Sequence, residues 1–248
     1  MKSLTIALSF ILATSAMSQN ATFDVTRNGT TPAMDSAIDY ALDIWSNCLV
    51  SDVPIKINVN HFNMTSAGPL GITFPNGRMN FPNAPEPDTW YPTCLANAMN
   101  GTELNPGEVD MDIFMNGYWD WYLGTDGNCP ADRYDFVSVF LHEIGHGLGF
   151  MSLAKVDDEK GAFGTLTALD FLPLMSSFPF PDLDGFPSVL DRYYVTPAGN
   201  RLTDTIQYQN NSTILGVLMR NNNLFYDGNW GVLTNDSTQP KILSLIHI

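Results

Sequence analysis

The sequence predicts an α+β fold with a mixed sheet, one helix that carries functional side chains, and a loop-rich C-terminal part. The first observation is a helical pattern at residues 34–48 followed by an alternating strand at 53–60. The second is another alternating segment, 109–115, which precedes a long helical pattern at 135–150. The third is that these patterns fade into loops and short segments beyond residue 150.

Residues 1–18 are typical of a secretory signal peptide. Lys2 gives a positive start, residues 4–13 form a short apolar run, and Ala16-Met17-Ser18 is a small-x-small cleavage site. We therefore expect a secreted protein whose mature chain begins at Gln19. No later segment approaches the roughly 20 apolar residues of a membrane span, so no transmembrane segment is expected.

Residues 243–248 resemble the translation of a sequencing adapter, and we expect them to be an artefact. His247 is therefore excluded from the candidate metal ligands. The folded domain is then residues 19–242, which we expect to be incomplete at its C-terminus. A genuine short hydrophobic terminus is the alternative.

The formal net charge of −15, with only 11 basic residues, argues against nucleic acid or an anionic membrane as partner. Cysteines in an exported chain favour a disulfide, and Cys94–Cys129 is the expected pair because both lie in Pro- and Gly-rich surroundings. Cys48 is then free or pairs with a segment beyond the chain. Sequons, which carry glycans only in a eukaryotic source, occur at Asn20, Asn28, Asn63, Asn100, Asn211 and Asn235.

The first helix is predicted from its start signals, Thr31 as cap and Pro32 at the first position. Its expected buried stripe is Ile38, Ala41, Leu42 and Trp45. The strand at 53–60 ends at His61, which we interpret as structural rather than as a ligand. Residues 63–108 are rich in Gly, Pro and Asn, with one short helix expected at 94–99.

The alternating segment 109–115 is expected either as an edge strand that could pair with an extended peptide or as an internal strand. The aromatic residues of 118–122 are interpreted as core rather than as a sugar platform, and a turn follows at 124–127. Short strands are expected at 193–195 and 223–226.

The helical segment 135–150 contains His142-Glu143-Ile144-Gly145-His146, an H-E-x-x-H motif. Histidines four apart lie on the same side of a helix, about 6 Å apart along its axis. Both imidazoles can therefore reach one Zn²⁺, and Glu143 can reach a water beside it. The motif predicts a zinc-dependent hydrolase with His142 and His146 as ligands and Glu143 as the catalytic base.

The residues around the motif support a two-faced helix. Its apolar stripe lies nearly opposite the histidines, Asp132 or Asp135 can cap its start, and Gly147 and Gly149 can end it. The alternative is an ordinary core helix whose histidines only make hydrogen bonds. The apolar stripe consists of Val137, Leu141, Ile144 and Leu148.

The segment 142–150, His-Glu-Ile-Gly-His-Gly-Leu-Gly-Phe, resembles the active-site helix of metzincin-type zinc metallopeptidases, especially the leishmanolysin-like pattern. It is also similar to a set of secreted bacterial-type proteins with the H-E-[IL]-G-H-G-L-G-F signature. The resemblance implies a zincin-like fold and a zinc endopeptidase that acts on protein or peptide substrates. It also implies that Gly149 lets the chain turn under the metal. Weaker matches lie at 91–97, 121–127, 134–136, 190–193 and 224–228.

The chain departs from the metzincin pattern at the third zinc ligand. The usual histidine position is Ser152, and no histidine follows His146 before residue 243. We expect the third ligand, and the methionine turn after it, beyond residue 242, so this chain alone should have little or no activity. Carboxylates are the alternative ligands within the chain, although each is explained more simply as a surface or capping acid: Asp157, Asp158, Glu159, Asp170 and Asp191. Met175 and Met219 are better explained as core or surface residues than as methionine turns.

Two other functional classes remain open. One is a secreted binding or adhesion module with a vestigial zinc site, which the intact Glu143 disfavours. The other is a zinc hydrolase that does not cleave peptides. Residues 182–185 resemble part of a Ca²⁺-binding loop but are too short for one, and an ordinary turn is the preferred interpretation. The sequence predicts no particular oligomeric state.

Overall fold

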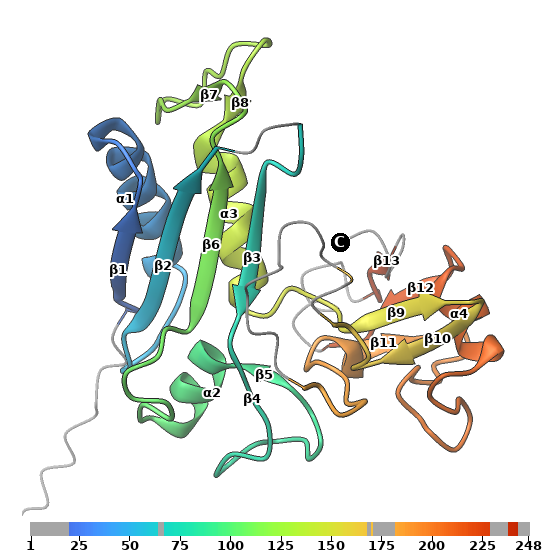
Figure 1. Ribbon diagram of the computed structural model, residues 1–248. Helices are drawn as coiled ribbons and strands as arrows, with labels where there is room; N and C mark the ends of the chain where they lie inside the picture. Colours follow the sequence, from blue (N-terminus) through green and yellow to red (C-terminus); the bar gives the residue numbers. More distant parts are fainter. Residues whose placement is uncertain (1–19, 64–66, 168–169, 171–181, 229–237, 243–248) are drawn as a thin grey trace, which may run out of the picture.

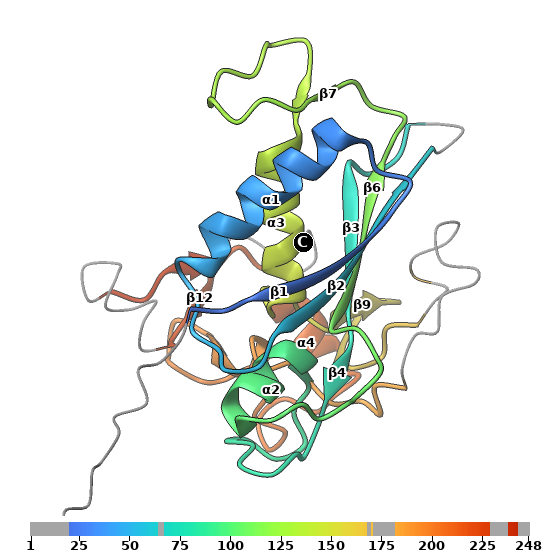
Figure 2. The same cartoon turned by 90° about the vertical axis from the view of Figure 1, so that its left-hand side faces the viewer.

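The computed structural model describes residues 20–63, 67–167, 170, 182–228 and 238–242. The predicted signal peptide, the segment 243–248, Met175 and Asn235 lie outside them. The fold is α+β, as expected. A four-stranded mixed sheet has the order β1-β2-β6-β3 and carries helices α1 and α3 on one face (Figures 1 and 2). Strands β1, β2 and β6 are parallel, and β3 is antiparallel to β6. The strands are β1 (Phe23–Asn28), β2 (Ile55–Phe62), β3 (Gly71–Pro75) and β6 (Met111–Asn116).

Helix α1 (Pro32–Ser46) begins where the sequence predicts. Thr31 caps it, since its Oγ1 accepts a hydrogen bond of 3.3 Å from the Met34 amide. Of the predicted stripe, Ile38, Ala41 and Leu42 are buried. Trp45 is partly buried and ties α1 to α3, because its Nε1 donates to the Leu141 carbonyl at 3.2 Å.

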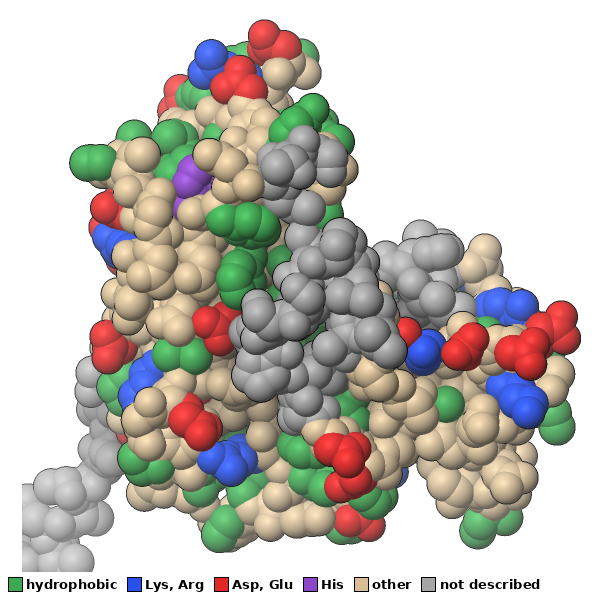
Figure 3. Space-filling view, viewed as in Figure 1, with side chains coloured by type: hydrophobic (Ala, Val, Ile, Leu, Met, Phe, Trp, Pro, Cys, Tyr) green, Lys and Arg blue, Asp and Glu red, His purple; other side chains and the backbone are tan. Residues whose placement is uncertain are grey.

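Alternation along the strands separates an apolar face from a mixed one. The helix-facing side chains include Ile57, Val59, Met111 and Ile113, all buried in the main hydrophobic core. The opposite face is polar over β2, where Asn58 donates to Asp112 at 3.0 Å. Figure 3 shows apolar side chains gathered over β3 and β6 on that face, with acidic and basic groups interspersed elsewhere.

Strand β3 lies within the segment 63–108, where only loops and a short helix were expected. It forms one edge of the sheet, whereas β6 is internal. Of the two alternatives for 109–115, the internal strand is therefore correct and the edge strand is wrong. The short helix is confirmed as α2 (Thr93–Asn100), and it follows a small ladder of β4 (Gly77–Arg78) with β5 (Tyr91–Pro92).

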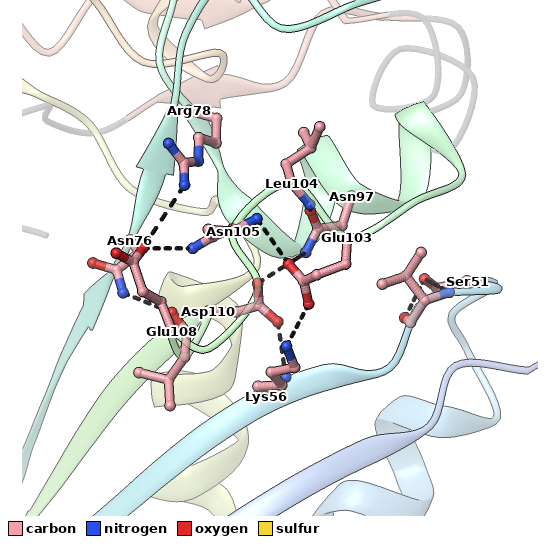
Figure 4. Close-up of polar contacts among 12 residues, drawn as sticks. Ser51, Lys56, Asn76, Arg78, Asn97, Glu103, Leu104, Asn105, Glu108 and Asp110 are labelled. Carbon is pink, nitrogen blue, oxygen red and sulfur yellow. Dashed lines mark hydrogen bonds and ion pairs between the residues drawn. The ribbon is translucent and has the colours of Figure 1, made fainter.

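A buried polar network ties β2 and β6 to the chain that follows α2 (Figure 4). The Asp110 carboxylate accepts from the Lys56 amide at 2.8 Å and from Asn97 Nδ2 at 3.2 Å. Asn97 also donates to Glu103, which forms an ion pair of 2.6 Å with the Lys56 ammonium group. Asp110 is buried, and this burial raises its pKa to about 6.

Helix α3 (Phe136–Gly147) carries the H-E-x-x-H motif. Its cap is Asp135, whose Oδ1 accepts from the Val137 amide at 3.1 Å, so of the two predicted caps Asp135 is the correct one. The loop before it holds a short parallel ladder of β7 (Trp121–Tyr122) and β8 (Tyr134–Asp135). The core interpretation of the aromatic segment is right for the buried Trp121 and wrong for Tyr118, which is exposed.

The C-terminal part is more ordered than the sequence predicts. A hairpin of β9 (Ala154–Asp157) and β10 (Lys160–Phe163) packs against helix α4 (Thr213–Met219). The predicted short strands at 193–195 and 223–226 are confirmed as β11 (Tyr194–Val195) and β12 (Leu224–Tyr226), which pair with each other. A short strand β13 (Lys241–Ile242) extends this small sheet. Figure 1 shows these elements forming a second body beside the main sheet.

The predicted Cys94–Cys129 disulfide is absent, and all three cysteines are unpaired. Cys94 is buried on α2, where its Sγ lies 3.5 Å from the Gly147 carbonyl. Cys129 belongs to the loop between β7 and β8, which lies at the other end of the main sheet from α2 (Figure 1). The prediction is wrong because Pro- and Gly-rich surroundings indicate loops but not which loops meet. Among the described helices, none has the length and apolarity needed to cross a bilayer.

Candidate active site

Helix α3 brings the two motif histidines together on one side. The Nε2 atoms of His142 and His146 lie 2.9 Å apart, and their ring planes are inclined by 82°. Two metal–nitrogen bonds of roughly 2.0–2.1 Å can converge on one point from such a pair. The two imidazoles therefore fit a single zinc ion.

The structure also fixes the tautomer of His146. Its Nδ1 lies 2.7 Å from the Phe150 carbonyl oxygen, and because a carbonyl only accepts, Nδ1 must carry the proton. The Nε2 lone pair is then free for a metal. The contact is possible because the chain turns back at Gly149, whose φ of +116° is a conformation that favours glycine.

Glu143 lies between α3 and the edge strand β3. Its Oε2 accepts a hydrogen bond of 2.8 Å from Thr73 Oγ1, and Glu143 is only 5% exposed. A Cβ atom at Gly71 would approach the Glu143 carboxylate to 2.9 Å, so the strand backbone touches this group. Burial raises the pKa of Glu143, while the Thr73 hydroxyl and the charges of the two histidines act in the opposite direction.

All three motif side chains line one cleft of about 680 Å³. Its other walls are β3, the chain around Trp90 and the segment that runs from Gly149 into β9. The cleft walls are mostly apolar, with Phe74, Leu153, Val156 and Val189 among their side chains. The histidines of α3 are therefore not enclosed in a hydrophobic core, because the face of the helix that carries them borders this cleft.

Ser152, at the usual place of a third metzincin histidine, serves a structural purpose. It donates at 2.6 Å to Asp191, which is fully buried and also accepts from the Leu153 amide. The Ser188 amide and hydroxyl donate to the same carboxylate at 2.8 and 2.9 Å. Asp191 therefore fastens the chain after α3 to the C-terminal part, and the structure does not bring it together with the histidines.

The other candidate ligands form no metal site with the histidine pair, although Asp170 lines the same cleft. Lys155 forms ion pairs with Asp170 at 2.6 Å and Asp157 at 3.6 Å. Asp158 and Glu159 form the turn between β9 and β10, both with positive φ. Within the described ranges, no three His, Cys, Asp or Glu side chains gather as a metal site.

Three further predicted positions have ordinary structural surroundings. His61 lies in β2, one residue before its end, with its Nδ1 3.1 Å from the Gly29 carbonyl. Asp182 accepts from the Asp184 amide at 3.1 Å in a local turn. Met219 is buried in the C-terminal hydrophobic cluster.

Sequence reasoning missed Thr73, Gly71 and the carbonyl of Phe150. Gly71 and Thr73 lie far along the chain from α3, and neither belongs to a motif. The only available signal was the alternation of residues 71–75, which the surrounding Gly, Pro and Asn residues obscured. The role of Phe150 could have been suspected from Gly149, which marks a turn directly after the second histidine.

Comparison with known proteins gave one family match. The model of a family described as SPBPB7E8-like matches residues 2–161, which include the whole H-E-x-x-H helix. No curated protein and no solved structure gave a significant match.

Proposed function

Given that the chain belongs to the SPBPB7E8-like family, we propose that it is a secreted zinc-dependent endopeptidase with a zincin-like fold. The observation that carries the proposal is the joint placement of three groups. Two imidazole nitrogens 2.9 Å apart and the Glu143 carboxylate border the same cleft, beside an edge strand of the sheet.

His142 and His146 would hold the metal through their Nε2 atoms. When bound, zinc supplies Lewis acidity that polarises a carbonyl and lowers the pKa of a water molecule. The Phe150 carbonyl keeps the ring of His146 oriented and makes Nδ1 the protonated nitrogen of the neutral ring, so that Nε2 is the nitrogen available to a metal. A third ligand would come from a residue outside the described ranges, and we expect it beyond residue 242.

Glu143 would act as the general base. Its Oε2 is engaged by Thr73, and among the described residues no donor reaches its Oε1. Oε1 can therefore accept a proton from the attacking water and return it to the leaving amine. This sequence of proton transfers needs no covalent intermediate.

The outer edge of β3, which pairs with no other strand among the described residues, suits an extended peptide. Hydrogen bonds from the Asn116 amide to the Leu70 carbonyl and from the Asn76 amide to the Asp110 carbonyl set the pairing pattern. In this pattern the even-numbered residues of β3 pair with β6, so the main-chain groups of Gly71 and Thr73 point away from it. A substrate strand could pair with these groups while its side chains contact the apolar walls of the cleft.

The test is hydrolysis of an unfolded protein by the complete protein, with the expected third ligand included, in the presence and absence of a chelator, together with its zinc content. Glu143→Gln should keep its zinc and lose most turnover, whereas His142→Ala and His146→Ala should lose the metal. Normal hydrolysis by Glu143→Gln would refute the role of the base. Stoichiometric zinc and full turnover in the 248-residue chain would refute the expected third ligand beyond it.

A further inference from the structure

One hydroxyl group links the sheet edge to the carboxylate of the motif. Thr73 is 7% exposed, and its Oγ1 donates to Glu143 Oε2 at 2.8 Å. The contact joins residues that are 70 positions apart in the chain and belong to different elements. Because the two residues are so far apart in the sequence, the tertiary fold and not a local motif creates this contact.

The same contact restricts the Glu143 side chain from two sides. The hydroxyl binds one oxygen, while the backbone of Gly71 lies so close that a Cβ there would reach 2.9 Å from Oε1. A glutamate side chain in a cleft otherwise has several rotamers at its disposal. Here the strand restricts that choice, and the Thr73 hydroxyl occupies Oε2 but not Oε1.

Thr73 faces the cleft in a second way. Thr73 lies opposite Ile113 of β6, and the two residues form a non-hydrogen-bonded pair of the antiparallel ladder. The N–H and C=O of Thr73 therefore point away from β6, toward the outer edge of the sheet. A peptide that added a strand to β3 would therefore pair with Thr73 itself. One residue would thus fix both the docked main chain and the carboxylate.

We propose that Thr73 is a positioning residue that sets the geometry between Glu143 and a peptide docked on β3. This inference rests on the proposed function. It adds a residue outside the H-E-x-x-H helix, with a defined atom, Oγ1, and a defined target, Oε2 of Glu143. Misplacement of a catalytic group by about 1 Å can cost on the order of 100-fold in rate.

The kinetic test compares Thr73→Val, which removes the hydroxyl and keeps the branched shape, with Thr73→Ser, which keeps the hydroxyl. In the complete protein, with the expected third zinc ligand included and zinc added, Thr73→Val should lower kcat on a peptide substrate by at least about tenfold while KM changes less than about twofold. Thr73→Ser should restore most of the loss, and zinc content should be the same in all variants. A wild-type kcat in Thr73→Val would overturn the proposal.

The matched control is Thr26→Val. Thr26 is an exposed threonine on β1, at the opposite edge of the same sheet, so the variant makes the same chemical change away from the cleft. It should leave kcat and KM unchanged. An equal loss in both variants would assign the effect to the sheet as a whole and overturn the positioning role.

A second readout needs no activity. The measurement is urea unfolding of the zinc-free single variants Thr73→Val and Glu143→Ala and of the double variant. The shift of the unfolding midpoint in the double variant should be smaller than the sum of the two single shifts. Additive shifts would overturn the contact. A wild-type protein that cleaves no peptide would defeat the proposed function, yet non-additive shifts would still support Thr73 as the group that holds the carboxylate.

Discussion

Alanine in place of Gly149 is expected to weaken zinc binding although neither histidine is changed. Gly149 has φ +116°, and an alanine Cβ there would lie 3.0 Å from Pro92 Cγ. Such a backbone conformation costs a residue with a side chain about 1–3 kcal/mol. Rotation of the backbone next to Gly149 relieves this strain and moves the Phe150 carbonyl.

The magnitude follows from the contact that would be lost. The Phe150 carbonyl lies 2.7 Å from His146 Nδ1 and keeps the proton on that nitrogen. Removing such a partner of a ligand histidine typically weakens metal affinity by roughly 10–100-fold, or about 1.4–2.7 kcal/mol. We expect a loss of zinc affinity in that range.

The assay is competition for zinc between the protein and a chromophoric chelator. Gly199→Ala is the control, because Gly199 also has positive φ, +79°, with no atom within 4 Å of an added Cβ. It should destabilise the fold slightly and leave zinc affinity unchanged. If Gly149→Ala binds zinc as tightly as Gly199→Ala does, the reasoning about the Phe150 carbonyl is wrong.

Three further predictions concern the scaffold. Burial raises the pKa of Asp110 from 3.8 to about 6, so the folded state binds this proton more tightly than the unfolded chain. The stability gained from that proton is present below pH 3.8 and lost as pH rises through 6. In Asp110→Asn, the fall in the free energy of unfolding between acidic and neutral pH should be smaller by about 3 kcal/mol, as measured by urea titrations at several pH values. The same pH dependence in the variant and the wild type would contradict this expectation. Asp191→Ala should cost at least about 3 kcal/mol in urea unfolding because several buried donors lose their acceptor, and a loss below about 1 kcal/mol would show that water replaces the carboxylate. Gly147→Ala should destabilise by about 1–3 kcal/mol in thermal unfolding, since its Cβ would overlap Met111 Sδ, and an unchanged midpoint would mean that Met111 moves aside freely.

The elements with local signals were predictable from the sequence. Thr31 and Asp135 cap α1 and α3 through hydrogen bonds to residues three and two positions away, so both helices could be located from a few neighbouring residues. The histidine pair was predictable for the same reason, since a helix alone brings His142 and His146 together.

The features that depend on distant contacts were not predictable. Strand β3 is short, and its identity depends on pairing with β6 across about forty residues of loop and helix. The disulfide prediction failed for the same reason. The neighbour of Cys94 is the C-terminal end of α3, and nothing in the sequence near Cys94 indicates that this helix end approaches it. Asp191 gave no signal of its role, because its four hydrogen bonds come from residues 152, 153 and 188.

The way β3 ends has a consequence for how the protein behaves at high concentration. An unpaired strand can recruit the same strand of another molecule and begin to aggregate. Here the outward-pointing amide donors of β3 are those of Gly71 and Thr73, because the next outward-facing residue is Pro75, which has no amide hydrogen to donate. The edge of β3 therefore offers few main-chain groups to the same strand of another molecule, which disfavours edge-to-edge aggregation.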